Sequence, residues 1–105
     1  MKLHEQQCRP LRGAPMAADE AEALRSQVPQ WQLVGAAIER RFEFDNFHQT
    51  MAFVNAVAWV AHQQDHHPDV QLSYGHCTVR FSTHSVGGLS INDFICAARI
   101  DALRT

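Results

Sequence analysis

The 105 residues are enough for one folded domain with a single hydrophobic core. Nine Lys and Arg residues against eleven Asp and Glu residues give a net charge of −2 without a basic cluster, which argues against a nucleic-acid partner. No apolar run approaches the ~20 residues of a membrane span, and the polar N-terminus does not have the pattern of a secretory signal. We therefore expect a cytoplasmic globular protein that does not enter a membrane.

The three cysteines, Cys8, Cys77 and Cys96, are odd in number and far apart in the sequence. This spacing suggests neither a disulfide framework nor a cysteine zinc site. Reduced thiols are expected, which agrees with a cytoplasmic location.

Residues 1–16 contain prolines and a glycine and no periodicity, so we predict a flexible N-terminal arm. The remainder, residues 17–105, is assigned to a single domain. Residues 17–27 are rich in helix formers, with acidic residues early and Arg25 late, and predict a helix that Pro29 ends.

Two strands are predicted next, at residues 31–34 and 36–44, because apolar and polar side chains alternate there. They form a hairpin around Val34–Gly35. Asp45 is in position to cap the helix that follows.

The strongest helical pattern covers residues 46–64. Its apolar stripe is expected to run through Phe47, Met51, Val54, Ala58 and Ala61, widened by Phe53, Val57 and Val60. Pro68 disfavours a helical conformation at His67, so the helix should end near Asp65.

A second hairpin is predicted from the alternation of residues 70–74 and 77–83. A glycine-containing loop follows, and Ser90 with Asp93 has the spacing of a capping box that opens a last helix to about Leu103. Tyr74 is interpreted as a strand and core residue, and Trp31 and Trp59 as packing residues.

The predicted order is α-ββ-α-ββ-α. It indicates an α+β fold in which a four-stranded antiparallel sheet carries helices packed on one face. Such a sheet leaves two unpaired edges, and pairing across a two-fold axis would cover one of them.

Seven histidines are present, and five of them lie within the 23 residues 62–84, among them the four candidates His62, His66, His67 and His84. Histidine is the side chain best suited to move protons near neutral pH. Other readings remain open: a helix C-terminus favours a cation, and the capping box alone explains Asp93. His62 and His66 also have the i, i+4 spacing of a zinc pair, although Gln63 replaces the glutamate of the HExxH motif.

Several of these residues form a recognisable pattern: DHHPD at 65–69, STH at 82–84, GGLS at 87–90, and Asp93. The pattern resembles the signature of the pterin-4a-carbinolamine dehydratase family, and weaker agreement extends over about residues 17–104. Two positions depart from the family pattern: His62 stands where a glutamate is more common, and Val70 where a tryptophan is common.

The resemblance implies the fold predicted above and the dehydration of 4a-hydroxytetrahydrobiopterin, or a related pterin, to the quinonoid dihydropterin. It implies no metal or organic cofactor, a homodimer or homotetramer, and a functional link to an aromatic amino-acid hydroxylase. It assigns catalysis to His66, His67 and His84, with Asp93, Asp65, Pro68, Ser82 and Thr83 supporting or binding substrate. Some relatives act as dimerisation partners, so a non-catalytic dimerisation or escort protein is the alternative.

Overall fold

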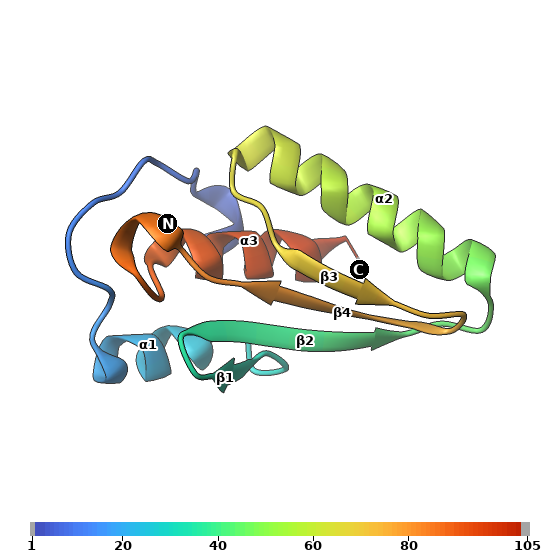
Figure 1. Cartoon of the computed structure of the whole chain (residues 1–105), viewed down its shortest axis with the longest axis horizontal. Helices are drawn as coiled ribbons and strands as arrows, with labels where there is room; N and C mark the ends of the chain where they lie inside the picture. Colours follow the sequence, from blue (N-terminus) through green and yellow to red (C-terminus); the bar gives the residue numbers. More distant parts are fainter. Residues whose placement is uncertain (1, 104–105) are drawn as a thin grey trace.

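The structure is a computed structural model and describes residues 2–103. Its elements follow the predicted order, with two short 3-10 helices in addition (Figure 1). In chain order they are η1 Leu3–Glu5, α1 Ala18–Arg25, β1 Gln32–Val34, β2 Ala37–Glu43, α2 Phe47–Gln64, β3 Asp69–Leu72, β4 His76–Phe81, η2 His84–Val86 and α3 Ile91–Ala102.

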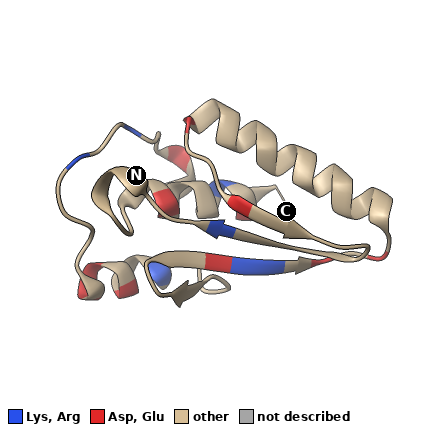
Figure 2. Ribbon diagram, viewed as in Figure 1, with Lys and Arg blue, Asp and Glu red and all other residues tan. Residues whose placement is uncertain are grey.

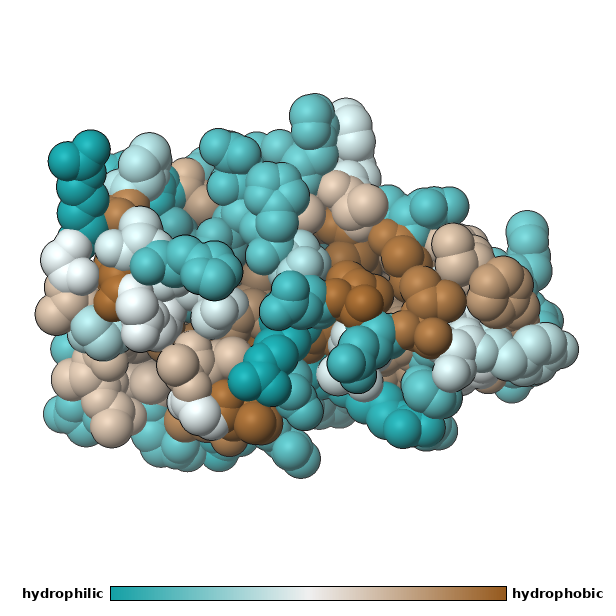
Figure 3. Space-filling view, viewed as in Figure 1, coloured by the Kyte–Doolittle hydropathy of each residue, from teal (hydrophilic) through white to brown (hydrophobic). Residues whose placement is uncertain are grey.

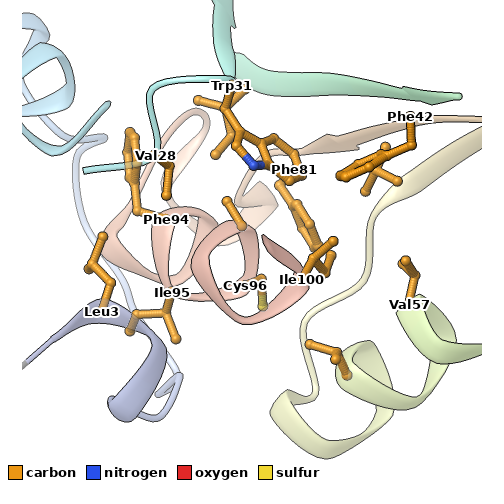
Figure 4. Packing of buried hydrophobic residues seen from close by; sticks show 14 of the residues in the cluster. Leu3, Val28, Trp31, Phe42, Val57, Phe81, Phe94, Ile95, Cys96 and Ile100 are labelled. Atoms are coloured by element: carbon orange, nitrogen blue, oxygen red, sulfur yellow. The ribbon is translucent and has the colours of Figure 1, made fainter. Parts of the chain in front are cut away.

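The four strands form one antiparallel sheet in the order β1-β2-β4-β3. The two hairpins therefore meet along β2 and β4, where Ile38 pairs with Phe81, and β1 and β3 are the edges. Helices α2 and α3 lie against one face of this sheet (Figures 1 and 4). The predicted α+β fold and its helix placement are confirmed.

The core lies between the sheet and α3 and is built around aromatic side chains (Figure 4). Trp31 is fully buried, and its ring meets Phe42 edge-on at 6.1 Å between centroids. The Trp31 Nε1 donates a 2.8 Å hydrogen bond to Asp101 Oδ1 on α3. The packing role predicted for Trp31 is confirmed, and the polar end of its ring ties β1 to the last helix.

The buried face of α2 differs from the predicted stripe. Its buried residues are Thr50, Phe53, Val57, Val60, Ala61 and Gln64. Phe47 is 47% exposed and Ala58 is also exposed, while Met51 and Val54 are half-buried. The helix is apolar on more than one side and carries no Lys, Arg, Asp or Glu (Figure 2). Periodicity therefore could not decide which side faces the sheet.

The start of α2 and the aromatic side chains Tyr74 and Trp59 correct three further expectations. The N-cap is Asn46, whose side chain accepts a 2.8 Å hydrogen bond from the Gln49 amide, and not Asp45. Tyr74 lies in the turn between β3 and β4 and is 67% exposed, because the alternation ends at Leu72. Trp59 is 59% exposed on α2.

The N-terminal segment packs against α3, where a flexible arm was expected. Leu3 of η1 is 5% exposed and belongs to the core, close to Ile95 (Figure 4). Arg99 of α3 donates through Nε to the Gln6 carbonyl at 3.1 Å. These contacts join residues more than ninety positions apart, which local sequence patterns do not reveal.

Within residues 2–103, no helix combines the length and apolarity needed to cross a lipid bilayer. Acidic and basic residues are interspersed along the other elements of the chain (Figure 2).

Candidate active site

The candidate site lies at the connection between the end of α2 and the start of β3. Asp65 caps α2 in the left-handed conformation, at φ 49°, and this reversal directs His66 toward α3. Strands β3 and β4 are antiparallel, with Asp69 opposite Arg80. The residues just before β3 and those just after β4 therefore lie at the same end of the sheet. The His-His-Pro run and the Ser-Thr-His run thus meet at one end of the sheet.

The centre of the site is a hydrogen bond of 2.6 Å between His66 Nε2 and Asp93 Oδ1. Asp93 is completely buried. Its other oxygen, Oδ2, accepts from the Ser90 amide and from Thr83 Oγ1, both at 2.9 Å. A buried carboxylate is tolerated when its lone pairs are filled in this way.

The capping box predicted at Ser90 and Asp93 is confirmed, and it explains how Asp93 is held in place. Ser90 caps α3, and the Asp93 side chain returns to the Ser90 backbone. That arrangement fixes the carboxylate at the first turn of α3 and leaves Oδ1 for His66. One acidic residue therefore both starts the helix and orients the histidine.

Two contacts orient the imidazole ring of His66, the hydrogen bond to Asp93 and a stacking contact with Phe81. The His66 ring stacks on Phe81 with centroids 5.7 Å apart and planes 10° apart. With Nε2 bound to Asp93, Nδ1 makes no hydrogen bond to any residue between 2 and 103, and the side chain keeps 12% exposure. Nδ1 is thus the ring nitrogen able to exchange a proton with a ligand.

The pKa of His66 is raised above its ordinary value. Burial alone would lower this pKa, because it disfavours the cation. The hydrogen bond that His66 donates to Asp93, together with the negative charge of Asp93, outweighs burial. The site therefore favours the cationic form of His66 more than water does.

A hollow of about 230 Å³ borders this pair. One wall comes from the N-terminal segment, at Cys8, Arg9, Pro10 and Leu11, and the rest from Gln64, Asp65, His66, Thr83, Ser85 and Asn92. The sequence alone does not reveal the N-terminal wall, because its contacts are long-range and it carries no motif.

The other predicted site residues lie around this centre. Thr83 belongs to the buried network, Asp65 lines the hollow, and Pro68 and Ser82 are half-buried beside it. His67 and His84 are exposed, His67 just before Pro68 and His84 at the start of η2. The structure joins His66, Thr83 and Asp93 by hydrogen bonds and leaves His67 and His84 on the neighbouring surface.

The histidine pair considered for zinc is not arranged as a shared ligand set. His62 is exposed and lies against Trp59, with ring centroids 5.6 Å apart, while His66 bonds Asp93. Over the part of the chain that the structure describes, no group of three or more His, Cys, Asp or Glu side chains is placed to hold a metal ion.

Fold and site together define a class: an α+β domain with a buried carboxylate that holds a histidine at the rim of an antiparallel sheet. The family described as pterin 4 alpha carbinolamine dehydratase matches residues 14–103. The chain belongs to this family, as the sequence resemblance predicted.

Relatives and solved structures agree with this assignment. A protein of Nitrosomonas eutropha, provisionally named pterin-4-alpha-carbinolamine dehydratase, is 54% identical over 104 residues, which cover 96% of this chain and 92% of that protein. One of Chromobacterium violaceum with the same provisional name is 49% identical, covering 98% and 96%.

Two solved structures have a similar fold. A transcriptional coactivator/pterin dehydratase from Brucella melitensis superimposes with a TM-score of 0.82 at 28% identity, covering 87% of this chain and 99% of that one. A pterin dehydratase-like protein described as a RuBisCO assembly factor in the alpha-carboxysome gives 0.57 at 26% identity, covering 70% and 84%.

Proposed function

We propose that this protein is a pterin-4a-carbinolamine dehydratase that removes water from a 4a-hydroxytetrahydropterin such as 4a-hydroxytetrahydrobiopterin. The observation that carries the proposal is the buried Asp93, which holds His66 at the hollow with Nδ1 unbonded. Family membership supports the same reaction.

In the proposed reaction, the C4a–O bond breaks as the departing oxygen takes a proton and leaves as water. The electron pair of the N5–H bond forms the C4a=N5 bond of the quinonoid dihydropterin, and its proton passes to a base. We assign the acid to His66, because the hydrogen bond to Asp93 and the negative charge of Asp93 raise the pKa of the imidazole and favour its cation.

We assign the base at N5 to His84, whose exposed imidazole is free to accept a proton from a bound pterin. His67 is proposed to position the pterin or share in proton transfer. Asp93 supports the His66 cation, while Asp65, Pro68, Ser82 and Thr83 shape the site. The chemistry needs no metal or organic cofactor.

The biological role that follows is recycling of tetrahydrobiopterin for an aromatic amino-acid hydroxylase. All three cysteines are thiols, which supports work in a reducing compartment such as the cytoplasm. We also propose a homodimer or homotetramer, supported by the two open sheet edges.

A non-catalytic dimerisation or escort role is the second candidate. It is favoured by the names of the two solved relatives, one a transcriptional coactivator and the other an assembly factor. Measuring catalytic turnover distinguishes the dehydratase from the escort protein, since an escort protein does not need to catalyse the reaction.

The deciding experiment follows the dehydration of 4a-hydroxytetrahydropterin, generated by a hydroxylase, by stopped-flow ultraviolet absorbance. Wild type should accelerate its decay, and the double variant His66→Ala/His84→Ala should lose about 10²–10⁴-fold per proton-transfer group removed. His48→Ala, an exposed histidine in the first turn of α2, is the matched control and should keep the wild-type rate.

Wild-type decay no faster than buffer would reject the enzyme and leave the escort role. The same assay after dialysis against EDTA tests the zinc reading. We expect an unchanged rate, and a loss restored by zinc would reject the metal-free mechanism.

A further inference from the structure

Two thiols from distant parts of the chain lie next to each other beside the candidate active site. The sulfur atoms of Cys8 and Cys96 are 3.6 Å apart, although the residues are 88 positions apart in the sequence. Cys8 belongs to the segment after η1, and Cys96 lies in the middle of α3. The proposed dehydration uses neither thiol.

Hydrogen bonds on both sides of Cys8 hold this approach in place. The Cys8 amide donates to Gln64 Oε1 at 2.8 Å. The next residue, Arg9, donates its amide to Asn92 Oδ1 at 3.2 Å and accepts from Asn92 Nδ2 at 2.7 Å. Because Asn92 lies one turn before Cys96 on α3, this pair of hydrogen bonds holds Cys8 next to Cys96.

The two thiols differ in the way that a peroxide-reactive pair requires. Cys8 is half-buried, whereas Cys96 is fully buried. The hydrogen bond from Cys96 lowers the pKa of the Cys8 thiol, which burial opposes and the nearby His66 charge assists. The pKa of Cys96 is raised, by its hydrogen bond to Cys8 and by burial. Cys8 is thus the more accessible and more acidic thiol of the pair, and Cys96 is its buried, less acidic neighbour.

We propose that Cys8 and Cys96 are a reversible redox modification site, in which a hydroperoxide oxidises Cys8 and Cys96 then closes an intramolecular disulfide. The Cys8 thiolate attacks one peroxide oxygen and the O–O bond breaks, which gives a sulfenic acid and, after protonation, one water. The Cys96 sulfur attacks the Cys8 sulfur, the S–O bond breaks, and hydroxide leaves with the Cys96 proton as a second water. Two thiols lose two electrons, and hydrogen peroxide gains them.

The rearrangement is small. A disulfide needs a sulfur separation near 2.05 Å, so the atoms must approach by about 1.5 Å. Cys96 is fixed in the helix, so the movement falls on the Cys8 side chain and segment. The bond would fasten to α3 the segment whose residues Cys8–Leu11 form one wall of the hollow.

Peptide mapping tests the site directly, because trypsin places the three cysteines in separate peptides. Cleavage after Lys and Arg, except before Pro10, yields peptides 3–12, 42–80 and 81–99. Reduced full-length protein is treated with hydrogen peroxide, alkylated in denaturant and digested. We expect a linked 3–12/81–99 peptide that dithiothreitol separates, with Cys77 in peptide 42–80 fully alkylated.

Two variants test the order of events. Cys96→Ala should form no disulfide and should accumulate a Cys8 sulfenic acid that dimedone traps. Cys8→Ala should leave Cys96 alkylatable after the same treatment. Cys77→Ala, which removes a buried thiol on β4, is the matched control and should still give the linked peptide.

Three alkylated thiols after peroxide treatment of wild type would overturn the proposal. A Cys8–Cys8 link between chains would also overturn it. These results come from the wild-type map even if a variant does not fold. Peptide mapping does not depend on enzymatic turnover, so its outcome is independent of the dehydratase assay.

Discussion

At the scale of single residues, Asp93 joins two functions in one carboxylate. Oδ2 completes the capping box of α3, and Oδ1 binds His66. The substitution Asp93→Asn removes the charge and keeps the shape of the side chain. It separates the two functions, because an asparagine oxygen can still accept the hydrogen bond from the Ser90 amide. The pKa of His66 then loses the contribution that raises it.

We predict that Asp93→Asn shifts the alkaline limb of the kcat/KM pH profile to lower pH. The sign follows from the proposed acid role: activity is present while His66 is protonated and is lost as pH rises through its pKa. With the carboxylate present this pKa is raised, so the limb lies higher in wild type. Profiles of dehydration rate against pH measure the shift.

Asp101→Asn is the matched control, since Asp101 is also on α3 but binds Trp31 and Arg40 instead of His66. Asp101→Asn should leave the alkaline limb of the pH profile at the wild-type pH, even if the substitution lowers the free energy of unfolding. An Asp93→Asn profile that coincides with wild type would remove His66 from the acid role.

The sequence indicated some of these site residues and not others. The family pattern named His66, Thr83 and Asp93, and the structure joins them by hydrogen bonds. The N-terminal wall stayed hidden, because Cys8 reaches Gln64 across 56 positions and Arg9 reaches Asn92 across 83. Local spacing contains no information about such contacts.

At the scale of elements, local rules predicted the order of helices and strands well. The capping box at Ser90 and the end of α2 at Asp65 follow from side chains within a few residues of each terminus. The rotation of α2 did not follow, because a helix without charged residues offers more than one apolar side. The cap of α2 was also misplaced by one residue.

That cap gives a prediction on stability. Asn46→Ala should lower the free energy of unfolding by about 1 kcal/mol, because the Gln49 amide loses its side-chain acceptor. Asp45→Ala is the matched neighbour, and it should cost clearly less because the Asp45 side chain is not the cap. Urea unfolding followed by circular dichroism compares them, and equal losses would contradict the assignment of the cap.

At the scale of the whole molecule, α2 presents a partly exposed apolar stripe beside its buried face. Helical spacing puts Phe47, Met51, Val54 and Ala58 on one side, next to the buried face. Figure 3 shows hydrophobic side chains on the viewed surface between α2 and β3, where Leu72 is 41% exposed. Such a surface supports the proposed association with a second copy of the chain.

We predict that Ala58→Glu lowers the molar mass in solution toward that of the monomer, because it places a charge in this outer stripe. Ala52→Glu is the matched control on another exposed side of α2 and should leave assembly intact. Light scattering coupled to size exclusion measures both. A monomeric wild type, or disruption by Ala52→Glu alone, would reject the stripe as the interface.

The position of α3 has a consequence for biosynthesis. All four strands precede it in the chain, yet it supplies Phe94, Ile95 and Ile100 to the centre of the core and the partner of Trp31. A ribosome therefore releases the complete sheet before α3, and the part of the sheet that α3 covers stays open to solvent and to chaperones in that interval. A nascent chain arrested before Ile91 has the strands but lacks this part of the core. We therefore expect the domain to fold only once α3 is available, in a single all-or-none step.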